Sequence, residues 1–264
     1  MNMIILTDLE GAAGVFSFAD QAFPDGKYYQ AAKGLLTAQV NAAVEAAVQS
    51  GIGDILVVDG HGCGGIEYES LHPAARLMHG MAPWTRADMC APVMRRYQLA
   101  ALVGQHAMEG TVDGNLNHSQ SSRNIAEIRL NDQPIGELAQ WALFCGAFDI
   151  PLVFVSGDHA ACREAEAFVP GITAAAVKEG MSREGAISLS LDKACELIGG
   201  QMEKAIKQQS ARPVAPLKWP APYRIAYRMK HTHPADEKSL SGWERVDAYT
   251  VAKSSPNLLD VLYA

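Results

Sequence analysis

A repeated alternation of short apolar runs with longer helical stretches is the sequence feature that most constrains the fold. Residues 4–6 and 55–58 are runs of Ile, Leu and Val, and residues 28–50 between them carry apolar side chains at steps of three and four. This period predicts a helix with one apolar face, and Gly51 is typical of a helix end. Because strand–helix–strand alternation is typical of parallel βαβ units, we expect an α/β fold with a mostly parallel central sheet flanked by helices.

The same alternation continues along the chain. It predicts further strands and helices, with strands at residues 99–103, 127–130 and 151–155 and helices at residues 136–148, 160–168 and 192–208. Residues 180–185 are rich in Gly, Ser and Arg and are expected to form a connection, and the four prolines of residues 209–222 indicate a linker or an extended crossing. We therefore expect an α/β domain at residues 1–190, followed at residues 191–264 by a helix, the Pro-rich crossing and a smaller C-terminal α+β lobe.

The composition is that of a globular protein with a sizeable core. Of the 264 residues, 48% are apolar and 19% are charged, and the net charge of −7 comes without any basic run. Nucleic-acid binding relies on clustered Lys and Arg, so no nucleic-acid partner is expected. The start of the chain lacks the basic region of a signal peptide, and no apolar run approaches the roughly 20 residues of a membrane span, so we expect neither export nor membrane insertion. Five scattered cysteines without a CxxC pair fit reduced thiols and predict a cytoplasmic protein.

Acidic residues and histidines directly follow three of the predicted strands. Asp8 and Glu10 come after the first strand, His61 after the second, and His106 after the strand at residues 99–103. Any one of them is more often a turn or loop residue than a ligand, but the carboxyl ends of parallel strands converge on one crevice. Two carboxylates and two imidazoles gathered there suit zinc, and a cation would offset the cost of burying their charges.

Two further candidates have weaker support from their positions. Glu137 lies in the first turn of the helix predicted at residues 136–148, where Glu also occurs for reasons of helix stability alone. His118 lies in a polar loop before the strand predicted at residues 127–130, and its simplest interpretation is a surface histidine. Beside a metal site, it could instead move protons or stabilise a developing oxyanion.

Other motifs point to different chemistry and are disfavoured. Residues 60–65 match the GxGxxG pattern of dinucleotide-binding proteins, but the acids and the proline that follow do not fit a helix N-terminus facing a pyrophosphate. His231 and His233 could share one face of a strand as a metal clip, yet the charged residues around them favour a solvated strand end or turn. Covalent serine or cysteine catalysis is unsupported, because no Gly-x-Ser-x-Gly elbow or comparable cysteine motif occurs.

The candidate residues lie within motifs that occur in a fixed order. These motifs are Thr7-Asp8-Leu9-Glu10-Gly11, Asp59-Gly60-His61, Gly104-Gln105-His106-Ala107, Asn117-His118-Ser119 and Asn131-Asp132-Gln133-Pro134-Ile135-Gly136-Glu137. Together they resemble the zinc-dependent D-aminopeptidase family. The resemblance extends through Asp158 and Lys178, covers about the first 190 residues, and becomes loose in the C-terminal lobe.

The resemblance implies a site with two zinc ions per subunit. Asp8 would bridge the two ions. Glu10 and His106 would bind one of them, and His61 and Glu137 would bind the other. Each ion would then have three protein ligands, which is the open set expected of catalytic zinc. Two metals can lower the pKa of a bound water and polarise a carbonyl together, as hydrolysis of an amide requires.

The resemblance also implies a catalytic residue, a substrate class and an assembly. His118 matches the family's catalytic residue. The implied reaction is release of an N-terminal D-amino acid from a short peptide, in a ring-shaped homo-oligomer for which a decamer is the family's form. Gly60, residues 62–65 and the loop at residues 107–117 depart from the family pattern and flank the site, so they bear on substrate preference. Two alternatives stay open: a dinuclear-metal amide or ester hydrolase of another substrate class, and a non-catalytic protein that binds a nucleotide or metabolite.

Overall fold

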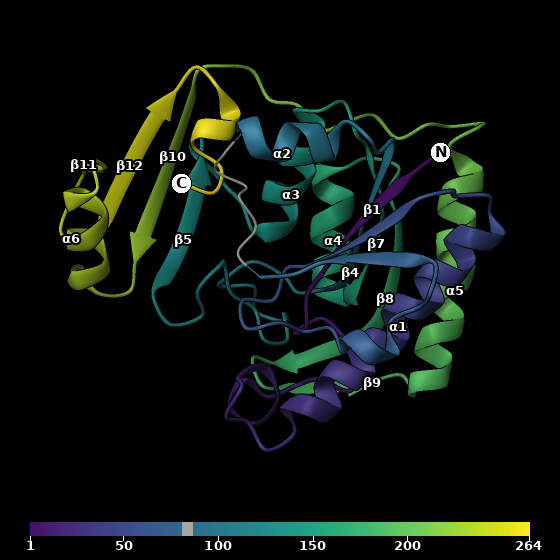
Figure 1. Ribbon diagram of the computed structural model, residues 1–264. Helices are drawn as coiled ribbons and strands as arrows, with labels where there is room; N and C mark the ends of the chain where they lie inside the picture. The colour runs from purple at the N-terminus through teal and green to yellow at the C-terminus, as the bar shows by residue number, and fades with distance from the viewer. Residues whose placement is uncertain (81–86) are drawn as a thin grey trace.

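The computed structural model describes residues 1–80 and 87–264, which form two β-sheets with helices on and between them (Figure 1). The larger sheet has the strand order β3 (Ala75–Met78), β2 (Ile55–Asp59), β1 (Met3–Thr7), β4 (Leu99–Gln105), β7 (Leu152–Asp158), β8 (Thr173–Ser182) and β9 (Gly185–Ser188). All of its neighbouring strands are parallel except β8 and β9. The predicted α/β class with a mostly parallel central sheet is confirmed.

The direction in which the parallel sheet grows reverses next to β1. From β1 the chain builds outward through β2 and β3, then returns to the other side of β1 and builds outward through β4, β7 and β8. Thr7 of β1 accordingly pairs with Asp59 of β2 on one side and with Val103 of β4 on the other. In open α/β sheets a reversal of this kind leaves a crevice at the carboxyl ends of the strands. The topology therefore provides a ligand site where β1 and β4 end.

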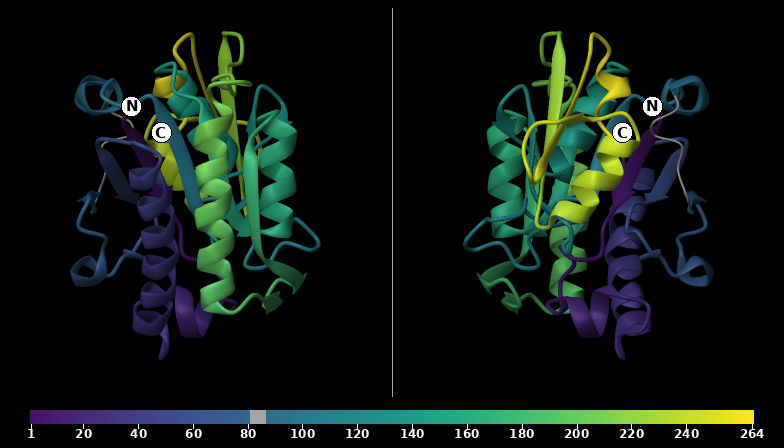
Figure 2. Two further views of the ribbon diagram at one scale, coloured as in Figure 1. Left: turned by 90° about the vertical axis from the view of Figure 1, so that its right-hand side faces the viewer. Right: turned by 90° about the vertical axis from the view of Figure 1, so that its left-hand side faces the viewer.

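Helices flank the parallel sheet. Figure 2 shows α1 (Tyr29–Gln49) and α5 (Leu191–Gln208) side by side over one face, and the two helices contact each other extensively. On the opposite side, α3 (Glu137–Gly146) and α4 (His159–Phe168) pack against β7. The buried residues of α1 include the predicted apolar positions, namely Leu36, Val40, Ala43, Val44 and Ala47.

A separate antiparallel sheet joins strands that are distant in the sequence. Its order is β11 (Glu244–Arg245), β12 (Thr250–Ser255), β10 (Tyr223–Met229), β5 (Ile125–Leu130) and β6 (Gln133–Pro134), and α6 (Thr232–Leu240) packs on it. β5 and β6 thus pair with C-terminal strands, while α5 packs against α1. The proposed domains at residues 1–190 and 191–264 stay a prediction. The antiparallel sheet takes strands from both segments, and α5 of the second segment packs against the parallel sheet.

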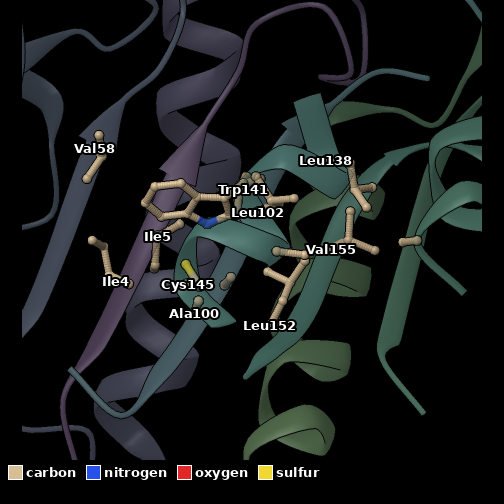
Figure 3. Packing of buried hydrophobic residues seen from close by; sticks show 14 of the residues in the cluster. Ile4, Ile5, Val58, Ala100, Leu102, Leu138, Trp141, Cys145, Leu152 and Val155 are labelled. Atoms are coloured by element: carbon tan, nitrogen blue, oxygen red, sulfur yellow. The ribbon is translucent and has the colours of Figure 1, made fainter. Parts of the chain in front are cut away.

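α3 lies between the two sheets (Figure 1), and its residues from Leu138 to Gly146 are all buried. Figure 3 shows the indole of Trp141 among side chains of the parallel sheet, close to Ile5. On the other side of the helix, Gln140 Nε2 donates a hydrogen bond of 2.9 Å to the carbonyl oxygen of Leu262. Burial of one large apolar side chain stabilises a fold by about 1.5–3 kcal/mol, so this helix and its first turn are held firmly from both sides.

Several elements were not expected from the sequence. Among them, β3 and α2 (Ala87–Met94) are short and lack a regular apolar period, and the strand β8 was not expected either. The expectation that residues 180–185 form a connection was wrong, because most of them lie in the β8–β9 hairpin. Gly180, within β8, packs closely against another segment, because a Cβ there would lie 2.3 Å from the carbonyl oxygen of Asp113.

The histidine pair near the C-terminal end lies at the start of a helix. His231 is the residue before α6 and His233 lies in its first turn, so the predicted strand end is replaced by a helix start. Both side chains are exposed. Among the helices of residues 1–80 and 87–264, none is long and apolar enough to cross a membrane.

Candidate metal centre

Four of the candidate ligands lie where the sheet topology predicts a crevice. Asp8 and Glu10 follow β1, His61 lies two residues beyond the end of β2, and His106 follows β4 directly. All four side chains are buried. The parallel pairing of β1 with β2 and β4 brings these strand ends together, as predicted from the sequence.

Glu137 and His118 reach the same cluster from outside the parallel strands. Glu137 is the first residue of α3, and its Oε1 atom lies 3.4 Å from His106 Nε2 and 3.7 Å from His118 Nε2. His118 belongs to the connection between β4 and β5. In that connection the backbone N–H of Gln120 donates to Glu137 Oε1 at 2.6 Å. The structure thus gathers all six residues singled out in the sequence.

The backbones that follow β1 and β4 touch each other directly. The N–H of Asp8 donates to the carbonyl of Val103 at 2.9 Å, and the N–H of Gly11 donates to the carbonyl of Gly104 at 2.7 Å. Gly104 has φ +80°, and a Cβ at this residue would lie 2.0 Å from the carbonyl oxygen of Asp8. Only glycine combines this dihedral with so close an approach. The contact fixes the segment that bears Asp8 and Glu10 against the one that bears His106.

Carboxylates and imidazoles of the cluster form close pairs. Asp8 Oδ2 lies 3.0 Å from His106 Nε2, and Glu10 Oε1 lies 3.4 Å from His61 Nε2. The ligand atoms of Asp8, Glu10 and His106 lie within 4.8 Å of one another, and so do those of His106, His118 and Glu137. Such sets of carboxylate oxygens and imidazole nitrogens match the ligands that zinc prefers.

Two buried ligand atoms of the cluster have no hydrogen-bond partner among the described residues. They are Glu10 Oε2 and His106 Nε2. Since an unsatisfied polar atom away from water is costly, such atoms are rare in folded proteins. A cation bound between them would satisfy both, so the residues present fit a metal ion.

The crowding of charges shifts the pKa values of the cluster. Burial, reinforced by the neighbouring Glu10 carboxylate, raises the pKa of Asp8 to about 7. For His61, burial works in the opposite direction, but the charge of Glu10 raises its pKa to about 11. Glu137 is also buried, which acts to raise its pKa, yet the nearby His106 imidazole, 3.4 Å away, outweighs burial and lowers the pKa to about 2. Protons on the imidazoles therefore compensate the carboxylates when no metal is bound, and metal binding must displace them.

His118 lies beside the ligands with a fixed ring orientation. Its ring stacks on that of His106, with centroids 3.9 Å apart and planes inclined by 16°. Its Nδ1 atom lies 2.9 Å from the carbonyl oxygen of Leu116. Because a carbonyl can only accept, Nδ1 carries a proton, which leaves Nε2 of the neutral ring free to accept one. Burial and the positive charge of His106 both lower the pKa of His118 and favour this neutral form.

A cavity of about 440 Å³ opens onto the cluster. Its walls include the carboxylates of Asp8, Glu10 and Glu137, the loop at residues 60–63 and the loop at residues 120–123. The volume falls within the range of cavities that hold small molecules, about 300–1,000 Å³. The site is therefore accessible to a ligand of limited size.

The sequence reasoning gave no role to the buried Lys178. From β8, its ammonium donates to the carbonyl oxygens of Glu10 and Val15 and, at 2.7 Å, to Asn115 Oδ1. The backbone N–H of Asn115 in turn donates to the carboxylate of Asp158 at 2.7 Å. These bonds tie the segments after β1 and β4 to the far strands of the sheet. A single lysine in the apolar run at residues 173–178 was the available signal for this role.

The glycine-rich run after β2 does not form a dinucleotide site. No helix follows it within residues 61–67, and the run wraps around the carboxylate of Asp59 instead. That carboxylate accepts hydrogen bonds from the N–H groups of Gly65 at 2.8 Å and Ile66 at 3.1 Å. The loop also places Cys63 Sγ 3.8 Å from His61 Nδ1. The hydrogen bonds to Asp59 thus fix the loop that contains His61.

Comparisons with known proteins agree with one another. A sequence model of the D-aminopeptidase family matches residues 1–264. A D-aminopeptidase of Bacillus subtilis (strain 168) is 31% identical over 221 residues, which cover 82% of this chain and 78% of that protein. Among solved structures, the Zn-dependent D-aminopeptidase DppA from Bacillus subtilis, described as a self-compartmentalizing protease, has a TM-score of 0.89 at 28% identity. This similarity covers 100% of the present chain and 94% of the other.

Proposed function

Because the chain belongs to the D-aminopeptidase family, we propose that it is a zinc-dependent metallopeptidase that removes an N-terminal D-amino acid from short peptides. The observation that carries the proposal is the buried cluster of carboxylates and imidazoles at the ends of β1, β2 and β4. Within it, Glu10 Oε2 and His106 Nε2 lack partners among the described residues. The adjoining cavity gives a short peptide access to this cluster.

We propose that the cluster holds two zinc ions. Asp8, Glu10 and His106 would hold the first, a set supported by the proximity of their ligand atoms. Asp8 would also bind the second ion, together with His61 and Glu137. Support for this second set comes from the family resemblance and from the place of both residues in the same cavity wall. Three protein ligands per ion leave a coordination position open for catalysis.

The chain's own residues would orient these ligands. Bound zinc supplies Lewis acidity, which activates a water and polarises the scissile carbonyl. The N–H of Leu9 donates to Asp8 Oδ1 at 2.9 Å, which fixes the direction of that carboxylate. The Nδ1–H of His106 donates to the carbonyl of Ala107 at 2.9 Å, so its Nε2 is directed to the metal side. Such supporting bonds set the tautomer and raise the basicity of a ligating imidazole.

His118 is the proposed catalytic residue. With Nδ1–H bound to Leu116, its Nε2 faces the cluster and can accept a proton from the attacking water. The same atom can then donate that proton to the amine that leaves when the C–N bond breaks. The hydrogen bond of Nδ1 keeps the ring in one orientation through both transfers.

The test combines metal analysis with peptide hydrolysis. Purified protein is expected to contain about two zinc ions per chain, to cleave D-aminoacyl peptides in preference to L-aminoacyl peptides, and to lose activity on chelation and regain it with zinc. Metal-free protein that keeps full activity would contradict the proposal. Equal activity on D- and L-aminoacyl amides, or hydrolysis of phosphate esters instead, would support a metal-dependent hydrolase of another substrate class.

We further propose that the chain assembles into a homo-oligomer that restricts access to the cavity, with a ring-shaped decamer as the expected form. The similar structure is described as that of a self-compartmentalizing protease. On the present chain, Val112, Met181 and Ile187 expose 93%, 64% and 61% of their surface. They lie close together, because Ile187 and Met181 are in the β8–β9 hairpin and Gly180 contacts Asp113. A monomer in light scattering at assay concentration would contradict this assembly.

The cytoplasm is the location that we propose. None of the five cysteines, all of which lie in the described residues, forms a disulfide, which fits a reducing compartment. Cell fractionation with antibodies against the protein tests this, and recovery outside the cytosolic fraction would contradict it.

A further inference from the structure

One arginine lines the cavity without an acidic partner. Arg123 is exposed, and its guanidinium lies 4.4 Å from the centre of the Phe23 ring. Among the described residues that line the cavity it is the one Lys or Arg, whereas three carboxylates lie at the metal end. No hydrogen bond or ion pair joins its guanidinium to another described residue. Its five N–H donors, in a planar fork that matches a carboxylate, are therefore available to a ligand.

The loop that carries Arg123 is fixed on both sides of this residue. On one side, the N–H of Gln120 donates to Glu137 Oε1, a carboxylate of the metal cluster, at 2.6 Å. On the other, Lys230 of the antiparallel sheet donates through its Nζ to the carbonyl of Ser122 at 2.9 Å and through its N–H to the carbonyl of Asn124 at 2.8 Å. The backbone at Arg123 is thus held at a set place relative to the cluster.

Aromatic rings connect Arg123 with the proposed catalytic residue. The Phe23 ring beneath the guanidinium stacks with that of Phe18 at 6.2 Å. The Phe18 ring meets that of His118 edge-on at 5.5 Å. Of the two phenylalanines, Phe23 lines the cavity, so the guanidinium lies against an apolar part of the cavity wall, and the two rings link it to His118.

We propose that Arg123 binds the C-terminal carboxylate of the substrate, so that the enzyme selects dipeptides and tripeptides with a free C-terminus. This inference rests on the proposed peptidase function. The scissile amide must lie at the metal cluster beside His118, and the rest of a short peptide then extends through the cavity past Phe23 toward Arg123. The terminal carboxylate of the peptide needs a cation at the end of the cavity away from the metal cluster, and Arg123 can bind it through two parallel hydrogen bonds. A longer peptide would carry its carboxylate beyond the 440 Å³ cavity.

The test compares free and amidated substrates. A D-alanyl dipeptide and a D-alanyl tripeptide are each assayed as the free acid and as the C-terminal amide, with zinc-loaded wild type and with the variants Arg123→Gln, Arg123→Lys and Arg123→Glu. For at least one peptide length, wild-type kcat/KM is expected to favour the acid over the amide by roughly 10- to 100-fold, the range of a charge-assisted hydrogen bond. The difference is expected mainly in KM, because the carboxylate is remote from the reacting bond.

The variants separate the charge of Arg123 from other effects. Arg123→Gln is expected to bring the acid-to-amide ratio close to one, Arg123→Lys to keep part of it, and Arg123→Glu to invert it. Arg212→Gln is the matched control, because Arg212 is exposed, lies in the Pro-rich crossing and does not line the cavity. A wild-type ratio near one for both lengths would overturn the inference. So would a ratio that survives in Arg123→Gln.

Binding measurements distinguish this inference from the proposed function. If zinc-loaded wild type cleaves none of the four peptides, the proposed function fails. Calorimetry then measures the affinity of the same peptides, which tests the carboxylate subsite without turnover. Tighter binding of the acid that disappears in Arg123→Gln supports the subsite, and equal binding of acid and amide overturns it.

Discussion

The residues at the strand ends and those of the connection between the two sheets are held in place by different means. Asp8 and His106 are positioned by parallel pairing of β1 with β4 and by backbone contacts beyond it. The connection at residues 107–124 has no helix or strand, and side-chain hydrogen bonds supplement the backbone bonds of its turns. The side chain of Asn117 makes three such bonds: it accepts from the N–H of Gly110 at 3.1 Å and donates to the carbonyls of Thr111 at 3.1 Å and Gly114 at 2.7 Å.

This difference separates two kinds of function. Four of the five proposed metal ligands follow strands of the parallel sheet, so we expect a change among them to remove the metal. The connection carries His118 and Arg123, to which we assign proton transfer and substrate binding instead of metal binding. We expect metal content and catalytic preference to be separable by mutation, and the following predictions test that separation from the largest effect to the smallest.

Asp8→Asn should abolish both metal binding and activity. Asparagine keeps the shape of the side chain but removes the charge that the proposal shares between two ions. Hydrolysis is expected to fall by at least ~1000-fold, together with the zinc content measured by atomic emission. Asp25→Asn is the control, because Asp25 is exposed and outside the cavity, and should change neither quantity. An Asp8→Asn protein with full zinc content and more than a tenth of the activity would contradict the assignment.

His118→Ala should separate chemistry from metal binding. Loss of a positioned proton carrier typically lowers kcat by about 10²- to 10⁴-fold, and zinc content is expected to remain at the wild-type level. His231→Ala, at an exposed position outside the cavity, serves as the control. If His118→Ala loses zinc in proportion to its activity, His118 is a ligand, and the two regions are less distinct than we propose.

Gly104→Ala should show how closely the strand ends are packed. The added methyl group would collide with the Asp8 carbonyl, and the alanine would have to adopt φ +80°. We therefore expect the free energy of unfolding to fall by about 2–4 kcal/mol and zinc binding to weaken. Gly110→Ala is the matched control within the connection, since Gly110 has φ +86° and open space around its Cβ position. Gly110→Ala should lose about 1 kcal/mol of unfolding free energy, the effect of the backbone dihedral alone. Equal losses in urea unfolding would show that the close contact is unimportant.

Glu164→Gln should change how stability depends on pH. Glu164 of α4 supports the connection, since its Oε2 accepts from the N–H of Met108 at 2.8 Å, and burial raises its pKa from 4.5 to about 7. The folded protein therefore holds this proton more tightly than the unfolded chain. The stabilisation is complete below pH 4.5 and is lost as pH rises through about 7.

Glutamine mimics the protonated carboxyl at every pH. Relative to wild type, the variant is expected to gain on the order of 2–3 kcal/mol of unfolding free energy between pH 5 and pH 8, measured by urea unfolding of zinc-loaded protein. Glu166→Gln, an exposed neighbour on the same helix, should show no such gain. A constant difference between Glu164→Gln and wild type across this range would refute the prediction.

The strand-end half of the site was predictable because it follows from one rule of topology. Short apolar runs predicted β1, β2 and β4, and parallel strands bring their carboxyl ends together, which gathered Asp8, Glu10, His61 and His106. The helix that presents Glu137 was also predicted, nearly to the residue. Its place beside His106 was not, because it depends on how α3 packs between two sheets.

The connection could not be predicted from its own sequence. The strand β5 was expected, but its partner β10 lies almost a hundred residues later, and no local pattern indicates such a pairing. The path of residues 107–124 depends on contacts with distant groups such as Lys178, Glu164 and Lys230. His118 was therefore reached only through the family resemblance, and Arg123 only through the structure.

The reversal of strand order beside β1 also determines when the site can form during folding. Asp8 meets Gln105 and His106 only after β1 has paired with β4, which closes a loop of almost a hundred residues. Contacts between residues so far apart in sequence form late and slowly. Zinc should therefore recognise the finished protein rather than guide the early chain. We expect the metal to slow unfolding far more than it speeds folding, so it contributes mainly to the kinetic stability of the native state.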